Sequence, residues 1–132
     1  MGIVSGSEYD KNKDFTSLES WQSAREVRLY FYKEVIPLIP KHEEYNLIIQ
    51  IKKAAVSITA NIAEGYGRYH YQDCIQFLRI SRGSLYELKD HLLSCFDLNY
   101  IDEEKLSSGQ TLIENTEKLL NGYIRIKTIQ KE

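Results

Sequence analysis

Apolar residues recur every three or four positions along four long stretches of the chain, which is the spacing of amphipathic helices. The pattern predicts helices over about residues 16–36, 43–65, 69–96 and 102–126. The alternating pattern of a half-buried strand is not found, and no internal repeat is evident. Four long helices joined by short corners make consecutive helices antiparallel neighbours. The sequence therefore predicts an all-α, antiparallel, up-down-up-down four-helix bundle.

The expected helix ends rest on a few residues. Thr16 and Glu19 have the spacing of a capping box, in which each side chain bonds the backbone of the other. Pro37 removes a donor, so the first helix should end or kink near residue 36. Gly65 is expected to close the second helix in the left-handed conformation, and Asp102 to cap the fourth helix.

The composition is that of one ordinary globular domain, with 132 residues, 42% hydrophobic and 27% charged. We expect a flexible tail over residues 1–14 and a single bundle domain over 15–132. No apolar run approaches the roughly 20 residues that span a bilayer, and no signal peptide is recognisable, so a cytoplasmic protein without membrane contact is expected. Cys74 and Cys95 would lie about 30 Å apart on one helix, too far to form a disulfide or share a metal.

The corner segment NIAEGYGRYHYQD, residues 61–73, contains glycines, tyrosines and Arg68. A helix rather than a strand precedes it, which argues against a dinucleotide-binding loop. Tyr66, Tyr69 and Tyr71 beside a cation suit either a protein interface or the stacking of exposed bases. The net charge of −2 and pI of about 5.9 favour the interface. The cations of residues 50–91 nevertheless leave a weakly basic patch in the middle of the chain.

A polar stripe, Ser57, Asn61 and Glu64, follows the second predicted helix beside a run of alanines. Buried polar side chains need partners, and the candidates in nearby sequence are Arg68, Arg79, Arg82 and Glu87. The stripe is either a ligand or RNA site, or a network that fixes helix register or a subunit contact. We favour the network. Gly83 is expected at a close contact between backbones.

Enzymatic chemistry is not expected. Di-iron bundles take their ligands from Glu-x-x-His pairs, and none of His42, His70 and His91 has a glutamate three residues before it. Ser57, Ser81 and Ser84 have helical spacing and no histidine placed by sequence as a base. We therefore predict no catalytic residue, metal or cofactor.

Two stretches carry a resemblance to a known family: QIKKAAVSITANIAEGYGR, residues 50–68, and FLRISRGSLYEL, residues 77–88. From about residue 18 to 126 the chain resembles the four-helix bundle protein family, also called the 23S rRNA intervening-sequence protein family and sometimes labelled ribosomal. The resemblance implies a homopentameric barrel. It also implies a distant relation to the accessory protein of diversity-generating retroelements, which binds a reverse transcriptase and nucleic acid.

The chain departs from the family pattern in two places on the second predicted helix. Lys52 and Lys53 stand where arginines are usual, and Thr59 where a proline is common. Lysine lacks the planar fork that grips phosphate in two places, which weakens any inherited anion site. The leading hypothesis is a non-enzymatic homo-oligomer, and the alternative is an accessory protein that docks to a reverse transcriptase or structured RNA. In the alternative, weak contacts to RNA or DNA would run through Lys52, Lys53, Arg68, Arg79 and Arg82.

Overall fold

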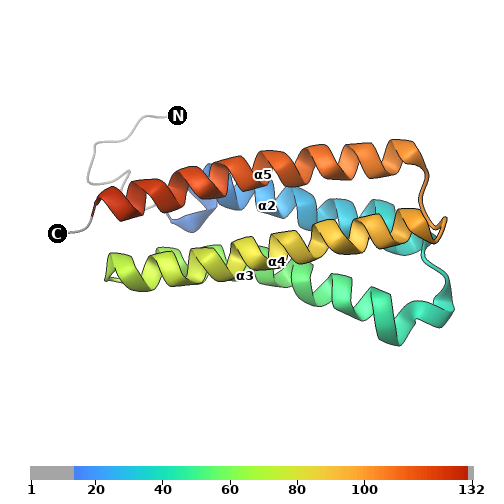
Figure 1. The fold of residues 1–132 in the computed structure, drawn as a ribbon. Coiled ribbons are helices and arrows are strands. Elements are labelled where there is room, and N and C mark those ends of the chain that lie inside the picture. The colour runs from blue at the N-terminus through green and yellow to red at the C-terminus, as the bar shows by residue number, and fades with distance from the viewer. Residues whose placement is uncertain (1–13, 131–132) are drawn as a thin grey trace, which may run out of the picture.

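Four long helices account for most of the computed structural model, which describes residues 14–130 (Figure 1). They are α2 (Glu19–Tyr30), α3 (Ile49–Tyr66), α4 (Tyr71–Asp97) and α5 (Glu103–Ile129). Each helix packs against the next one along the chain, and α2 also packs against α5, which closes the bundle. The predicted all-α antiparallel four-helix bundle is confirmed. The expected tail falls outside the described residues except for Asp14.

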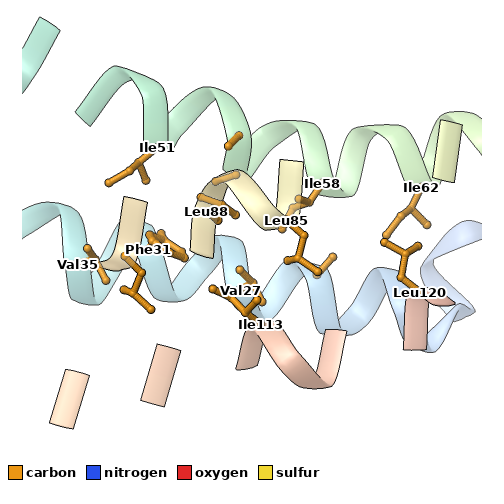
Figure 2. Packing of buried hydrophobic residues seen from close by; sticks show 14 of the residues in the cluster. Val27, Phe31, Val35, Ile51, Ile58, Ile62, Leu85, Leu88, Ile113 and Leu120 are labelled. Carbon is orange, nitrogen blue, oxygen red and sulfur yellow. The ribbon is translucent and has the colours of Figure 1, made fainter. Parts of the chain in front are cut away.

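A single apolar core runs along the axis of the bundle. Phe31, Ile58, Leu85 and Leu120 come from the four successive helical segments and are almost completely buried. Figure 2 shows Ile58 close to Leu85 near the middle of the core, with Phe31 toward one end of it and Leu120 toward the other, next to Ile62. The three- and four-residue spacing seen in the sequence therefore corresponds to the inward face of every helix.

The chain enters the bundle through a short 3-10 turn, Phe15–Ser17, rather than through the predicted capping box. The carboxylate of Asp14 accepts hydrogen bonds from the backbone N–H and the hydroxyl of Thr16. α2 then begins after Leu18, which offers no side-chain cap. The capping-box prediction is wrong because the Thr16 hydroxyl is already bonded to a nearby carboxylate.

The corner between α2 and α3 is irregular on both sides of its two prolines. α2 continues through a π-helical turn, Phe31–Val35, into a 3-10 turn, Ile36–Leu38, so the predicted kink near residue 36 is confirmed. A second 3-10 turn, Lys41–Glu43, and a second π-helical turn, Glu44–Ile48, lead into α3. The backbone is non-helical at Tyr45, which separates this entry from the regular helix.

At the two remaining corners, the left-handed residue is not the glycine that the sequence predicts. α3 continues through Gly65, and its C-cap Gly67 has a right-handed φ of −79°. Among residues 14–130, the left-handed residue is Asn99, with φ of 64°, at the end of α4. There the N–H of Tyr100 donates to the carbonyl of Cys95 at 2.8 Å, the pattern of a Schellman cap. The predicted left-handed role of Gly65 is wrong, whereas the predicted Asp102 cap of α5 is confirmed.

Gly65 instead lies where α3 and α4 approach each other closely. A Cβ atom added there would lie 3.1 Å from the carbonyl oxygen of Cys74 and 3.3 Å from the Cβ of Phe77. At Gly83 the same test finds nothing within 4 Å, so the expected close contact at Gly83 is not found within the described chain. The backbone contact therefore lies at the end of the α3–α4 hairpin.

We expect Gly65→Leu to lower the free energy of unfolding by about 1–3 kcal/mol, because the side chain has to displace the α4 backbone. Urea denaturation followed by circular dichroism measures this change. Gly83→Ala is the matched control, and it should raise stability by about 0.5–1 kcal/mol through lower backbone entropy of the unfolded chain. A Gly65→Leu protein as stable as wild type would show that the two helices separate easily at this point.

Candidate interaction surface

A small polar cluster joins α3 to α4 near the middle of the outer side of their interface. The hydroxyls of Ser57 and Ser84 lie 2.7 Å apart. The amide nitrogen of Asn61 donates to the carbonyl and hydroxyl oxygens of Ser57, both at 2.9 Å. Ser84, weighed above only as a nucleophile, proves to be the cross-helix partner of the predicted stripe.

A second serine shows how closely these two helices pack. The buried hydroxyl of Ser81 donates to the carbonyl of Ile58 across the helix interface at 2.7 Å. Within residues 14–130, no buried side-chain nitrogen or oxygen lacks a hydrogen-bond partner. The polar groups between α3 and α4 are therefore satisfied by the fold itself.

Glu64, the third residue of the predicted stripe, lies apart from the cluster. Its carboxylate forms an ion pair with Arg68 at 2.7 Å, one turn along the exposed side of α3. The guanidinium of Arg68 also lies 4.6 Å from the centre of the Phe77 ring. An exposed pair of this kind contributes about 0.3–0.5 kcal/mol to stability, so its main effect is to position Arg68 at the corner.

The other proposed partners of the stripe point elsewhere. The half-buried Arg82 donates to the amide oxygen of Asn121 on α5 at 2.9 Å. Arg79 and Glu87 are exposed on α4, and neither forms an ion pair within the described part of the chain. Among the hydrogen bonds and ion pairs of the described residues, Arg68 is the one candidate of the four that is bonded to the predicted stripe.

The three corner tyrosines differ in accessibility. Tyr69 is 94% exposed and Tyr66 is 38% exposed, whereas Tyr71 is half-buried and packs against the core. The ring of Tyr69 meets that of His70 edge to face, with centroids 5.0 Å apart. Two tyrosines beside Arg68 thus remain available to a partner, and Tyr71 belongs to the fold.

The five cations predicted to contact nucleic acid do not gather into one patch. Lys52 and Lys53 are exposed near the start of α3, and Arg68 lies fifteen residues beyond Lys53, about 22 Å along the helix direction. Arg79 is exposed on α4, while Arg82 is engaged by Asn121. The structure therefore presents separate small clusters rather than a continuous basic stripe.

Several contacts between distant segments could not be predicted from the sequence. Arg28 donates to the buried hydroxyl of Thr59 at 2.7 Å, which gives the residue that replaces the family's proline a role in joining α2 to α3. The hydroxyls of Ser23 and Thr116 lie 2.6 Å apart in the core between α2 and α5. Only the polar residues at otherwise apolar helix positions hinted at these pairs.

At the end of the bundle where the two prolines lie, hydrogen bonds shift the pKa values of two glutamates and one lysine. The ammonium of Lys105 donates to the carboxylate of Glu34 at 2.6 Å, which lowers the pKa of Glu34 and raises that of Lys105. A hydrogen bond from the Tyr100 hydroxyl at 2.7 Å likewise lowers the pKa of Glu43. Both carboxylates therefore hold segments of this end together in their ionised form.

Neither cysteine has the environment of a reactive thiol. Cys74 and Cys95 are free and buried. Burial raises the pKa of both thiols, that of Cys95 to about 11, which disfavours the nucleophilic thiolate at neutral pH.

Among the described residues, no three histidine, cysteine, aspartate or glutamate side chains form a group suited to a metal ion. In the same part of the chain, none of the helices combines the length and the apolar character of a membrane span.

The fold defines a four-helix bundle protein. Its buried polar groups are paired within the bundle, and its outer faces are available for contacts. A family model described as 23S rRNA-intervening sequence protein matches residues 16–122, most of the chain. The chain belongs to this family, and the resemblance noted in the sequence is confirmed. Comparison with individually characterised proteins gave no match.

The Ser57–Ser84 bond can be tested with a double-mutant cycle. We expect Ser57→Ala and Ser84→Ala to be coupled by about 0.5–1.5 kcal/mol, the net value of one hydrogen bond. Urea denaturation of the wild type, the two single variants and the double variant gives the coupling energy. Ser107→Ala, at an exposed position of α5, is the control and should show no coupling with Ser57→Ala. Additive effects of the two cluster variants would show that the serines contribute independently.

Proposed function

We propose that this protein is a non-enzymatic, homo-oligomeric scaffold and that its assembly is a pentamer. Membership of the 23S rRNA-intervening sequence protein family supports the proposal, because the resemblance implies a homopentameric barrel. The pentamer therefore rests on the family. Self-association has support of its own in the surface of α3.

The single observation that carries the proposal is that α3 is apolar on two opposite sides. Its inward side contributes the fully buried Ile51, Ile58 and Ile62. On its outward side Ile49 is 38% exposed and Val56 is 49% exposed, and the alanine at position 60 next to them is also exposed. Apolar side chains gathered on the outer face of a helix often mark a contact with another protein. A neighbouring copy would cover the side that the single chain leaves in water.

The absence of an enzymatic role is part of the same proposal. Among the described residues, the hydroxyls of Ser57 and Ser84 bond to each other, and that of Ser57 also accepts from the amide of Asn61, so neither is bonded to a histidine base. The free thiols are held in their protonated form by burial. We also propose a cytoplasmic location, since two unpaired thiols suit a reducing compartment.

The alternative function is that of an accessory protein that docks to a reverse transcriptase or structured RNA. One observation favours it: Tyr69 is almost fully exposed beside Arg68, which suits contact with an unstacked base and a phosphate. A ring would repeat this corner and raise the affinity by avidity. The acidic net charge and the scattered cations argue for weak binding.

Light scattering on the purified protein should give a mass several times the 15.4 kDa of one chain, and five times for the proposed pentamer. Burial of the outward side of α3 supplies the driving force. Measurements over a dilution series separate a stable oligomer from a concentration-dependent one. A monomer at micromolar concentration would overturn the proposed function.

Fluorescence anisotropy with structured RNA and with duplex DNA tests the alternative. We expect weak binding that falls steeply with added salt, because phosphate contacts release counterions. Lys52→Glu/Lys53→Glu/Arg68→Glu should abolish it, whereas Lys33→Glu/Lys41→Glu/Arg125→Glu, at exposed positions outside the predicted set, makes the same change in net charge and is the matched control. Tight binding at physiological salt that survives the triple reversal and selects one RNA would refute the scaffold proposal.

A further inference from the structure

The outward side of α3 has the pattern of a coiled-coil seam. Six positions follow one another at alternating spacings of four and three residues, as the a and d positions of a heptad do. They are Ile49, Lys53, Val56, Ala60, Ala63 and Gly67, here called the α3 seam. Four of these side chains are apolar, and all six positions are exposed or half-buried in the single chain. The core uses a different set of α3 residues, so the α3 seam is free for a partner.

A second seam with the same kind of spacing runs along α5. Its positions are Leu112, Asn115, Leu119, Gly122, Ile126 and Ile129, here called the α5 seam. Ile126 is 53% exposed and Ile129 is 72% exposed. The α5 seam borders an open, mainly apolar groove of about 350 Å³, whose other wall includes Leu18 just before α2. This groove is a place where the side chains of another helix can insert.

The two seams lie at matching heights along the bundle. Ser57 faces Ser84 on α4, and the flanking α4 residues Arg82 and Tyr86 contact α5 at positions 121 and 117. The level of Ser57 on α3 is therefore that of residue 119 on α5. Since α3 and α5 are both antiparallel to α4, they run in the same direction (Figure 1). Each position of the α3 seam thus has a counterpart at its own height on the α5 seam.

We propose that the α3 seam of one copy packs against the α5 seam of the next copy as a parallel, in-register pair of helices. The proposal rests on the self-association proposed above and names the two surfaces that meet. Rotation about an axis parallel to the helices leaves every residue at its own height. Copies related in this way bring Val56 to Leu119 and Ala60 to Gly122 without any shift along the axis.

The layers of this pair are complementary in size. Small residues of the α3 seam meet large ones of the α5 seam at its C-terminal end, where Ala63 faces Ile126 and position 67 faces position 129. The Ala60–Gly122 layer has almost no side chain, and a Cβ added at Gly122 would meet nothing within 4 Å in the described part of its own chain. Backbones can therefore approach most closely at that layer.

One polar layer sets the register of the pair. Lys53 falls opposite Asn115, and both residues are exposed in the single chain. The amide nitrogen of Asn115 donates to the hydroxyl of Ser23 at 3.4 Å, so its amide oxygen is the group that can accept from Lys53. A polar residue at one a position of a coiled coil specifies register at some cost in stability. A shift by one heptad in one direction would place Lys53 opposite Gly122, and a shift in the other direction would place Asn115 opposite Ala60. Only the in-register alignment gives each polar side chain the other as its counterpart.

Because the two seams differ, each copy uses one surface to bind the preceding copy and another to bind the next. Such a heterologous contact continues until the rotation closes a ring. α3 and α5 each pack on both α2 and α4, so they occupy diagonal positions in the bundle. The groove beside Leu18 turns the α5 seam toward α2, away from the point directly opposite the α3 seam. A closed ring requires that the two contact surfaces of each copy are not diametrically opposite, because contacts on opposite sides would extend in a line.

Disulfide trapping tests this contact. The double variant Ala60→Cys/Gly122→Cys, oxidised under mild conditions, should give a ladder of covalent multimers on a non-reducing gel, since the close layer suits the Cα separation of about 4.4–6.8 Å that a disulfide needs. Neither single variant should cross-link, and co-expressed single variants should give dimers only. The native thiols are buried, so the wild type serves as the background. Ile80→Cys/Gly122→Cys, with an exposed α4 residue at about the height of Ala60 in place of the seam residue, is the matched control and should give no ladder.

A second measurement does not depend on disulfide geometry. Val56→Glu should reduce the mass measured by light scattering to that of one 15.4 kDa chain, because the charge would be buried in the contact. Leu93→Glu, at an exposed position of α4, should keep the wild-type mass. Circular dichroism establishes that both variants are folded.

The outcomes separate the two proposals. An oligomer that gives no ladder and tolerates Val56→Glu overturns the seam pairing and leaves the proposed function standing. Cross-linking by Ala60→Cys alone would mean that α3 packs against α3, which also overturns the pairing. A monomeric wild type overturns both proposals.

Discussion

The close packing of α3 against α4 is the constraint on which the rest of the structure depends. The two backbones meet at Gly65, where there is no room for a side chain without moving α4. The hydroxyl of Ser81 reaches the α3 backbone directly, and Ser57 meets Ser84 without an intervening residue. Short polar side chains and glycine are needed here because larger ones would force the helices apart. With this hairpin set, α2 and α5 complete the core by covering its remaining inward face.

The same packing explains why α3 has two apolar sides. One side is committed to the core through isoleucines, and the other, with Ile49 and Val56, stays outside. The hydrophobic effect favours covering exposed apolar surface, but a single bundle has no further helix with which to do so. The fold thus satisfies its internal polar groups and leaves part of its apolar surface in contact with water.

Most of the fold could be predicted from the sequence, because helix period and proline positions are local signals. The role of Gly65 could not, since a glycine after an apolar run indicates a left-handed cap, yet this one allows the approach of α4. α3 ends instead at Gly67 in a right-handed conformation, and the left-handed Asn99 lies at the end of another helix, α4. The candidate surface was predictable only in part, because its contacts also depend on how the helices pack against one another. The choice of Ser84 as partner of the stripe depends on how α4 aligns with α3. Arg82 was expected to meet the stripe and instead reaches Asn121, because its side of α4 faces α5.

An even number of antiparallel helices brings the chain back to the end of the bundle from which it started. The beginning of α2 and the end of α5 lie at the same end in Figure 1, away from the proline corner and the Asn99 corner. In a ring whose copies all run in the same direction along its axis, the two rims are therefore unlike. One carries the start of α2, the end of α5 and the α3–α4 corner of every copy, and the other carries the proline corner and the Asn99 corner. A domain fused directly before Asp14 or directly after residue 130 would crowd the first rim and leave the second accessible.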